Sequence, residues 1–235
     1  MPKLRNLLLA GAAMLLLGAG LAAEARADCE ASPAPGVDWS VCRKTGLILR
    51  GQDLTGAKLQ GADLARSDLS RAVLARASLT KAGLSRTTLK DADLSGADLS
   101  KAHGARTDFG GARLTGANLT KAELSRADFS GAQLAGADLQ KAELGRSDLS
   151  GADLEGADLS GSYLARVRFK DARLAKANLT DAYLQLASLA GTDLSEAVGL
   201  TAAQLAESCG DETTKLPAGL ARPAAWPCSG GDSTN

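Results

Sequence analysis

One histidine and two glutamates are the residues whose types and spacing could support chemistry at a single point. His103 is the only histidine in the sequence, and Glu123 and Glu143 follow it at every twentieth position. If a structural repeat of that length stacked these side chains about 4.8 Å apart, they could hold a metal ion weakly. Ordinary side chains on a solvated face fit the same spacing, and we expect no metal site.

Motifs for catalysis are missing from the rest of the sequence. It contains no serine–histidine–aspartate order, no glycine-rich phosphate loop and no metalloprotease helix motif. The many aspartates recur within a repeated unit rather than as isolated acid–base pairs. The 27 basic residues balance the 27 acidic ones, so bulk charge gives no argument for a nucleic-acid partner. We expect a protein that is not an enzyme and needs no cofactor.

Basic residues at fixed intervals are the stronger candidates for a function. A lysine series and an arginine series each recur at every twentieth position, and the candidate binding face consists of Lys81, Arg86, Lys101, Arg106, Lys121, Arg126, Lys141 and Arg146. In a stacked structure they would line two edges of one side, where an acidic protein or an anionic polymer could dock. The alternative is an ion-paired ladder with the neighbouring carboxylates of Asp68, Asp108, Asp128 and Asp148.

A five-residue period positions all of these side chains. Stepping by five from Leu49 to Leu194 gives 30 central positions, of which 26 are Leu, three are Phe (Phe109, Phe129 and Phe169) and one is Gly104. Ala holds 21 of the 30 places two residues before each centre. Five matches neither the helical period of 3.6 nor the strand period of 2.0. The pattern therefore predicts a solenoid in which inward side chains pack between neighbouring coils.

The tandem A-[DN]-L-x-x units, seen plainly in the block DADLSGADLSKA, resemble those of the pentapeptide repeat family. The resemblance extends over residues 47–198. It implies an all-β solenoid, a right-handed quadrilateral β-helix, with the central residue and the small residue two places earlier pointing inward. Segments 81–100, 121–140 and 141–160 are similar to one another over their whole length, which supports four units per coil. The 30 units then form about 7.5 coils and a rod of ~36 Å.

The two ends of such a rod must be covered, because open edges would pair with other chains. We expect residues 28–46 to form an N-terminal cap, with Trp39 plugging the first coil and Lys44 breaking the period. Residues 199–235 are expected to hold a short α-helical cap and a tail. Thr201 and Gln204 have the spacing of a helix capping box, and Gly210 would end the helix.

An apolar cluster near the C-terminal end leads to an expectation about the tail. Tyr163 and Tyr183 share one outward column, and Leu186 and Val198 also point outward in this period. An exported monomer should not leave such a cluster bare. We therefore expect residues 211–228 to fold back over the last coils with Trp226 buried. The alternative is a cluster that docks a second subunit or another protein.

Four cysteines allow three pairings, and the rod selects one of them. A disulfide needs Cα atoms within about 7 Å, whereas the two cysteine pairs lie at opposite ends of the stack. The sequence therefore predicts Cys29–Cys42 and Cys209–Cys228. Because no two cysteines have CxxC spacing, we set aside a zinc or dithiol redox site.

Residues 1–27 are predicted to be a secretory signal peptide. Lys3 and Arg5 precede an apolar run over residues 7–21, and Ala25-Arg26-Ala27 is a small-x-small cleavage signal. Retention of this segment as an anchor helix is the alternative. Disulfides suit an oxidising compartment, so we expect an exported bacterial protein, periplasmic or secreted.

These features favour an exported structural or binding module that presents a rod-like surface to a protein or an anionic envelope polymer. The resemblance offers a second hypothesis, because some cytosolic pentapeptide repeat proteins mimic DNA and bind type II topoisomerases. That role suits an acidic, dimeric, cytosolic rod. The export signal, the cysteines and the basic columns all argue against it here.

Overall fold

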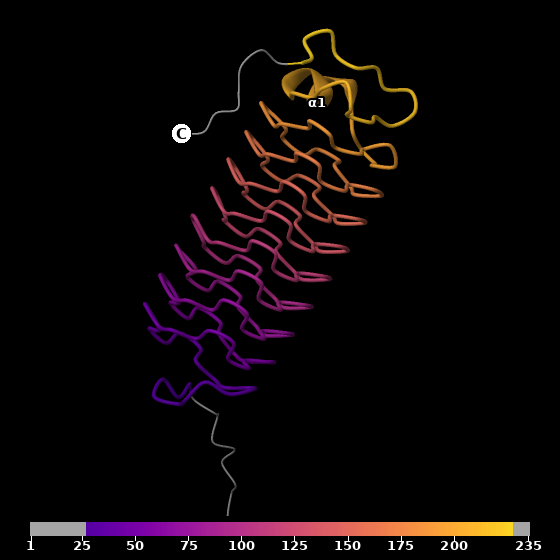
Figure 1. Cartoon of the computed structure of the whole chain (residues 1–235). Coiled ribbons are helices and arrows are strands. Elements are labelled where there is room, and N and C mark those ends of the chain that lie inside the picture. The colour runs from indigo at the N-terminus through magenta and orange to yellow at the C-terminus, as the bar shows by residue number, and fades with distance from the viewer. Residues whose placement is uncertain (1–26, 228–235) are drawn as a thin grey trace, which may run out of the picture.

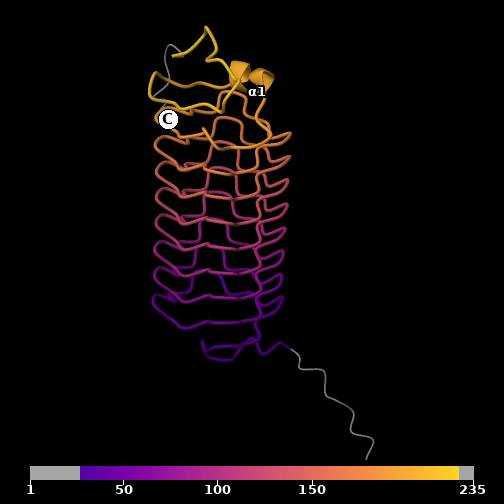
Figure 2. The same ribbon diagram turned by 90° about the vertical axis from the view of Figure 1, so that its right-hand side faces the viewer.

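Each five-residue unit pairs in parallel register with the unit four places later, and this holds along the whole repeat. The structure is a computed structural model, and it describes residues 27–227. Single-residue pairs run from Asp38 with Lys58 to Asn178 with Val198, and the offset between partners is the same in each. Four units therefore make one coil, and the coils stack along a single axis (Figures 1 and 2). The expected β-helix of pentapeptide units is confirmed, with α1 (Ala202–Glu207) at its C-terminal end.

Backbone hydrogen bonds join each coil to the next. The N–H of Leu64 donates to the carbonyl oxygen of Gly83 at 2.8 Å, and the N–H of Gly83 donates to that of Ala62 at 2.9 Å. Within a coil, β-turns connect the sides, as where the N–H of Ser67 donates to the carbonyl of Leu64 at 3.1 Å. These bonds satisfy the main chain through isolated bridges rather than long strands.

The central Leu and Phe residues fill the interior, as expected. Every Leu and Phe at this position from Leu49 to Leu194 is at most 3% exposed. The alanines two residues earlier are also buried, which lets opposite walls of the coil approach each other. The rings of Phe109 and Phe129 stack on consecutive coils with centroids 4.6 Å apart and planes 3° from parallel. The core is therefore a continuous column that touches solvent only at its ends.

Gly104 replaces a core Leu without leaving a hole. A Cβ placed on Gly104 would lie 2.6 Å from Leu124 Cδ2, 2.6 Å from Thr107 Oγ1 and 3.2 Å from Leu84 Cβ. Thr107 Oγ1 in turn lies 2.7 Å from the carbonyl oxygens of Leu84 and Gly104. Neighbouring side chains have closed over this position, so it is not the cavity that a missing Leu would suggest.

At the N-terminal end, the predicted disulfide Cys29–Cys42 is present, with Cα atoms 5.5 Å apart. Trp39 is 1% exposed and its indole Nε1 donates to the carbonyl of Ala31 at 3.1 Å, as expected of a plug. Lys44 was expected to break the period, but the backbone pairing continues through it. Its N–H still donates to the carbonyl oxygen of Asp63 in the next coil. Its ammonium lies 4.1 Å from the Trp39 ring centroid and covers the plug.

At the C-terminal end, α1 closes the last coil. The predicted capping box is present: Thr201 accepts from the N–H of Gln204, and the Gln204 side chain accepts from the N–H of Thr201. Gln204 Nε2 also donates to the carbonyls of Leu179 and Ala182 at 3.0 and 2.8 Å, which fixes the helix on the stack. The helix is capped by Ser208 rather than ended by Gly210, because the chain returns to extended pairing at Cys209.

The tail folds back over the end of the rod, as expected for its described residues. Cys209 pairs with Ser188 and Lys215 pairs with Asp193, so the tail begins as a further, looser coil. Trp226 is 7% exposed, and its Nε1 donates to the carbonyl of Ser208 at 2.8 Å. Figure 2 shows the tail beyond α1 at the end of the stack. Cys228 lies outside the described residues, so its pairing with Cys209 stays a prediction.

The tail does not cover the apolar cluster, and that part of the expectation is wrong. Tyr163, Tyr183, Leu186 and Val198 remain 48%, 39%, 51% and 52% exposed. The reason is that residues 209–215 extend the two sides that carry Ser188 and Asp193. The two tyrosine rings instead stack on each other, with centroids 5.2 Å apart.

Between residues 27 and 227 we find no helix with the length and apolar character needed to cross a bilayer.

Candidate functional site

The eight predicted residues form an exposed basic face on the rod. We call Lys81, Arg86, Lys101, Arg106, Lys121, Arg126, Lys141 and Arg146 the basic face, and all eight are exposed. The lysines lie at the corner where the chain enters one side of the coil, and the arginines lie at the corner where it leaves. Stacking brings each series into one line along the rod, with a rise of about 4.8 Å per coil.

Backbone geometry does not explain why these corners are basic. Each of the eight residues is the third residue of a β-turn with φ between 56° and 62°, the left-handed region that glycine adopts most easily. At the other two corners glycine holds the same place in most coils, as at Gly111, Gly116, Gly131, Gly136, Gly151 and Gly156. A non-glycine residue in this region costs about 1 kcal/mol. The local fold therefore favours glycine where the basic face has Lys or Arg.

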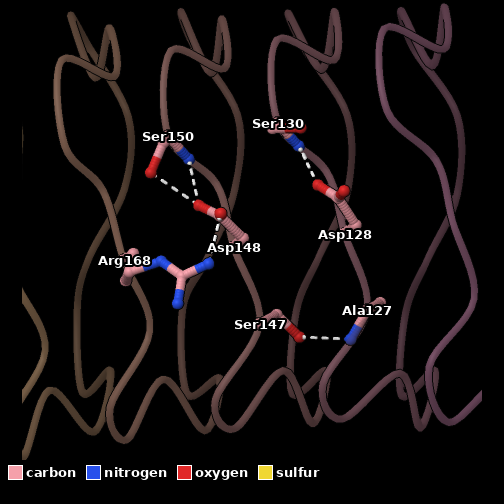
Figure 3. Close-up of polar contacts among 7 residues, drawn as sticks. All are labelled: Ala127, Asp128, Ser130, Ser147, Asp148, Ser150 and Arg168. Atoms are coloured by element: carbon pink, nitrogen blue, oxygen red, sulfur yellow. Dashed lines mark hydrogen bonds and ion pairs between the residues drawn. The ribbon is translucent and has the colours of Figure 1, made fainter. Parts of the chain in front are cut away.

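Within residues 27–227, no member of the basic face lies within 4.0 Å of a carboxylate oxygen. The carboxylates expected to form an ion-paired ladder with it have other partners. Asp68 pairs with Arg50, and Asp148 pairs with Arg168 (Figure 3). Asp108 and Asp128 accept backbone N–H groups at 2.9 and 2.8 Å. The side chains of the basic face therefore form no ion pairs with carboxylates of the described part of the chain.

The aspartates have a structural role that the sequence analysis did not assign. In many units the carboxylate accepts from the N–H, and often the hydroxyl, of the residue two places later, as Asp148 does from Ser150 (Figure 3). These contacts brace the turns. The recurring D-L-S triplet was the signal that could have revealed them.

A second structural set is a series of buried hydroxyls beside the arginine corner. Thr87 Oγ1 donates to the carbonyl of Leu64 at 2.8 Å, and Ser147 Oγ donates to that of Leu124 at 3.0 Å. Ser147 also accepts from the N–H of Ala127 one coil earlier (Figure 3). These bonds tie consecutive coils together under the arginines, so that corner rests on a rigid wall.

His103 and Glu123 come together as their spacing predicted. His103 Nδ1 lies 3.1 Å from Glu123 Oε2, and both side chains are more than half exposed. In the part of the chain that the structure describes, no three His, Cys, Asp or Glu side chains group closely enough to hold a metal ion. This pair is a surface contact between the two lines of the basic face.

The arginine line borders a groove that the sequence analysis missed. An open hollow of about 410 Å³ is lined by Ser125, Arg126, Gly145, Arg146, Tyr163, Ala165, Arg166 and Gln185. Gly145 is essential to its shape, because a Cβ there would lie 2.9 Å from Tyr163 Cε1. The signal was a glycine at 145 where the coils before and after have Ser125 and Ala165.

Two carboxylates that hold the C-terminal cap have strongly lowered pKa values, which predicts acid sensitivity. Hydrogen bonds from Lys215 and Ser195 lower the pKa of Asp193 from 3.8 to about 2, and the Thr213 hydroxyl is the main cause of a similar value for Asp211. A lowered pKa stabilises the fold above pH 3.8, and this stabilisation is lost as the pH falls towards 2. We expect the melting temperature to be flat near neutral pH and to fall across that interval.

The measurement is a series of thermal melts between pH 7 and pH 2, with Asp193→Asn and Asp211→Asn combined as the comparison. The double variant should start lower at neutral pH and fall less steeply below pH 4. Parallel curves for the two proteins would contradict a role for these carboxylates.

Comparison with known proteins is consistent with this geometry. The sequence profile of the family described as pentapeptide repeats matches eight copies, over residues 45–71, 53–91, 67–103, 92–131, 127–171 and 162–198. No curated protein matches the chain.

Of three solved structures that resemble this chain, two, HetL and the Arabidopsis protein, are pentapeptide repeat proteins. HetL, involved in heterocyst differentiation regulation in the cyanobacterium Nostoc sp. strain PCC 7120, is 27% identical, covers 77% of this chain and 88% of its own, and has a TM-score of 0.32. QnrB1, a plasmid-mediated fluoroquinolone resistance protein, is 16% identical over 74% of this chain and 91% of its own, with a TM-score of 0.44. A thylakoid-lumen protein of Arabidopsis thaliana is 33% identical over 42% of this chain and 65% of its own, with a TM-score of 0.25. Since the profile matches span most of the sequence and coincide with the paired coils, the chain belongs to the pentapeptide repeat family.

Proposed function

We propose that this protein is an exported, non-catalytic binding module that presents its basic face to an acidic partner. The observation that carries the proposal is the set of eight exposed cations without a carboxylate partner among the described residues. Two parallel lines of positive charge attract a partner of opposite charge from a distance and orient it along the rod. The partner is an acidic protein or an anionic polymer of the cell envelope.

Export is part of the same proposal. Its support is the signal-like segment 1–27 and the disulfide Cys29–Cys42, which persists in oxidising compartments. Cell fractionation with N-terminal sequencing tests it: the mature chain should begin at Asp28 in the periplasm or the medium. A cytosolic chain with an intact N-terminus would contradict export.

The right-handed sense of the helix and the count of about 7.5 coils also stay predictions.

Binding to a type II topoisomerase is the alternative that the family suggests. A mimic of DNA needs a strongly acidic surface, whereas this sequence has equal numbers of acidic and basic residues and a continuous basic face. At its identity and TM-score, the likeness to QnrB1 adds nothing in favour of this role. We therefore do not adopt it.

Neutralising Arg106, Arg126 and Arg146 together should weaken binding to an anionic matrix. Retention on a sulfated resin at low salt should fall about tenfold and should depend less steeply on salt, because charge contacts are screened over about 10 Å at 0.1 M salt. Melting temperature should not fall, since these side chains point outward.

A matched control is the triple variant Arg71, Arg76 and Lys176 to Gln. These three residues occupy the same left-handed turn position at the other two corners, with φ of 58°, 57° and 59°. The control loses the same charge but leaves the basic face intact, so its retention should change little. Equal loss in both variants would indicate a response to net charge alone and would overturn the proposed face.

A further inference from the structure

We infer that the groove along the arginine line is a binding site for a linear acidic polysaccharide that carries carboxylate groups. This inference rests on the proposed function and narrows it to one place and one class of partner. The groove spans three consecutive coils through Arg126, Arg146 and Arg166. Tyr163 and Gln185 lie at its C-terminal end.

The arginines set the charge and the spacing of the ligand. Guanidinium groups bind carboxylates through paired, planar hydrogen bonds, and they keep their charge at any physiological pH. Stacking places the three Arg backbones about 4.8 Å apart along one line. Such a line matches an extended chain with regularly repeated charges better than it matches a single small anion.

The walls of the groove favour a hydroxyl-rich chain over a protein segment. Besides the arginines they offer the Ser125 hydroxyl, the Gln185 amide and the edge of Tyr163, which is 48% exposed. These groups donate and accept hydrogen bonds. Protein partners are held mainly by anchors buried in desolvated pockets, whereas this hollow is open and its aromatic ring stays half exposed.

Gly145 and the stacked tyrosines shape the site. Because residue 145 has no side chain, the Tyr163 ring lies directly against the coil below it. Stacking on Tyr183 at 5.2 Å holds the same ring from the other side. A rigid aromatic ring beside three arginines is thus built into the wall, and its position needs no ordering when a ligand binds.

The test is binding of the full exported chain to polygalacturonate, measured by calorimetry or by gel retardation. Arg126, Arg146 and Arg166 are replaced together by Gln in one variant, and Arg66, Arg86 and Arg106 in another. Both triples lie in the same column and turn position and lose the same charge. The groove variant should bind about tenfold more weakly or worse, whereas the second triple, which removes part of the basic face but leaves the groove intact, should weaken binding only about threefold.

A third variant, Gly145→Ser, tests the groove without changing charge. The new side chain should displace the Tyr163 ring and weaken binding several-fold, while the melting temperature shows whether the coil remains folded. If serine leaves both binding and stability unchanged, the shape of the groove has no role and the inference fails.

Other outcomes separate the inference from the proposed function. If both arginine triples weaken binding equally, the groove is overturned and the basic face stands. If neither arginine triple weakens binding, both the groove and the basic face are overturned. Methyl-esterified polygalacturonate has the same backbone without the charges, so its binding at equal strength would overturn carboxylate recognition. Equal binding of polyglutamate through the groove would replace the polysaccharide with an acidic protein.

Discussion

Removing residues 211–235 is expected to lower the melting temperature sharply and to promote aggregation. The truncation deletes Trp226, which is 7% exposed and donates from Nε1 to the Ser208 carbonyl. It also deletes Thr214, whose buried hydroxyl donates to the carbonyl of Leu189, and Lys215, which pairs with Asp193. The last coil would then expose its apolar interior and its unpaired backbone groups.

The single substitution Trp226→Ala should reproduce much of this loss, at about 3–5 kcal/mol of unfolding free energy. Trp226→Phe is the intermediate variant, because it keeps an aromatic ring in place while removing the indole N–H and one of the two fused rings. Denaturant unfolding and light scattering measure the two effects. If truncation left stability unchanged and abolished contact with a partner, the tail would belong to an interface and not to a cap.

Replacing Gly104 by Leu, which restores the repeat pattern, is expected to destabilise the protein by about 3 kcal/mol, because overpacking a filled core commonly costs about 1–3 kcal/mol. The sequence pattern alone would predict the opposite, since a Leu occupies most of the equivalent positions. In the structure even a Cβ would lie 2.6 Å from both Leu124 and Thr107. Thr107 cannot yield freely, because its hydroxyl is hydrogen-bonded to backbone carbonyls.

A double variant sharpens this test. Combining Gly104→Leu with Leu124→Ala transfers the bulk from one coil to its neighbour, so it should be more stable than the sum of the two single effects predicts. Chemical denaturation of the four proteins gives the coupling energy. A Gly104→Leu variant that is more stable than the original would show that space was left at this position.

The repeat pattern was sufficient to predict the fold because each unit meets the same environment. A period of five decided which side chains face the interior, and the recurrence at every fourth unit decided which ones stack. The capping box of Thr201 and Gln204, the plug Trp39 and the disulfide Cys29–Cys42 also followed from local spacing. The same reasoning placed the eight cations of the basic face along two corners.

The partners of individual side chains could not be predicted in this way. The sequence suggested that aspartates would pair with the arginine column, whereas Asp148 pairs with Arg168, which lies one coil later in its own column, and with Ser150 two residues later. Long side chains rotate through several bonds, so membership of a column does not determine which neighbour they reach. Only the tertiary arrangement shows that the cations of the basic face form no ion pair within 4.0 Å with a carboxylate of the described chain.

Irregular positions also depended on the three-dimensional structure. The sequence marked Gly104 and Gly145 as departures from the pattern, but it did not show that Leu124 fills one space or that Tyr163 lies against the other. It likewise placed the tail near the last coils without deciding which sides it covers. The sequence by itself determined the repeating frame, because burial and backbone pairing recur with the period. The tertiary structure decided what breaks that frame, because contacts between coils depend on the volume and torsion angles of each neighbouring side chain.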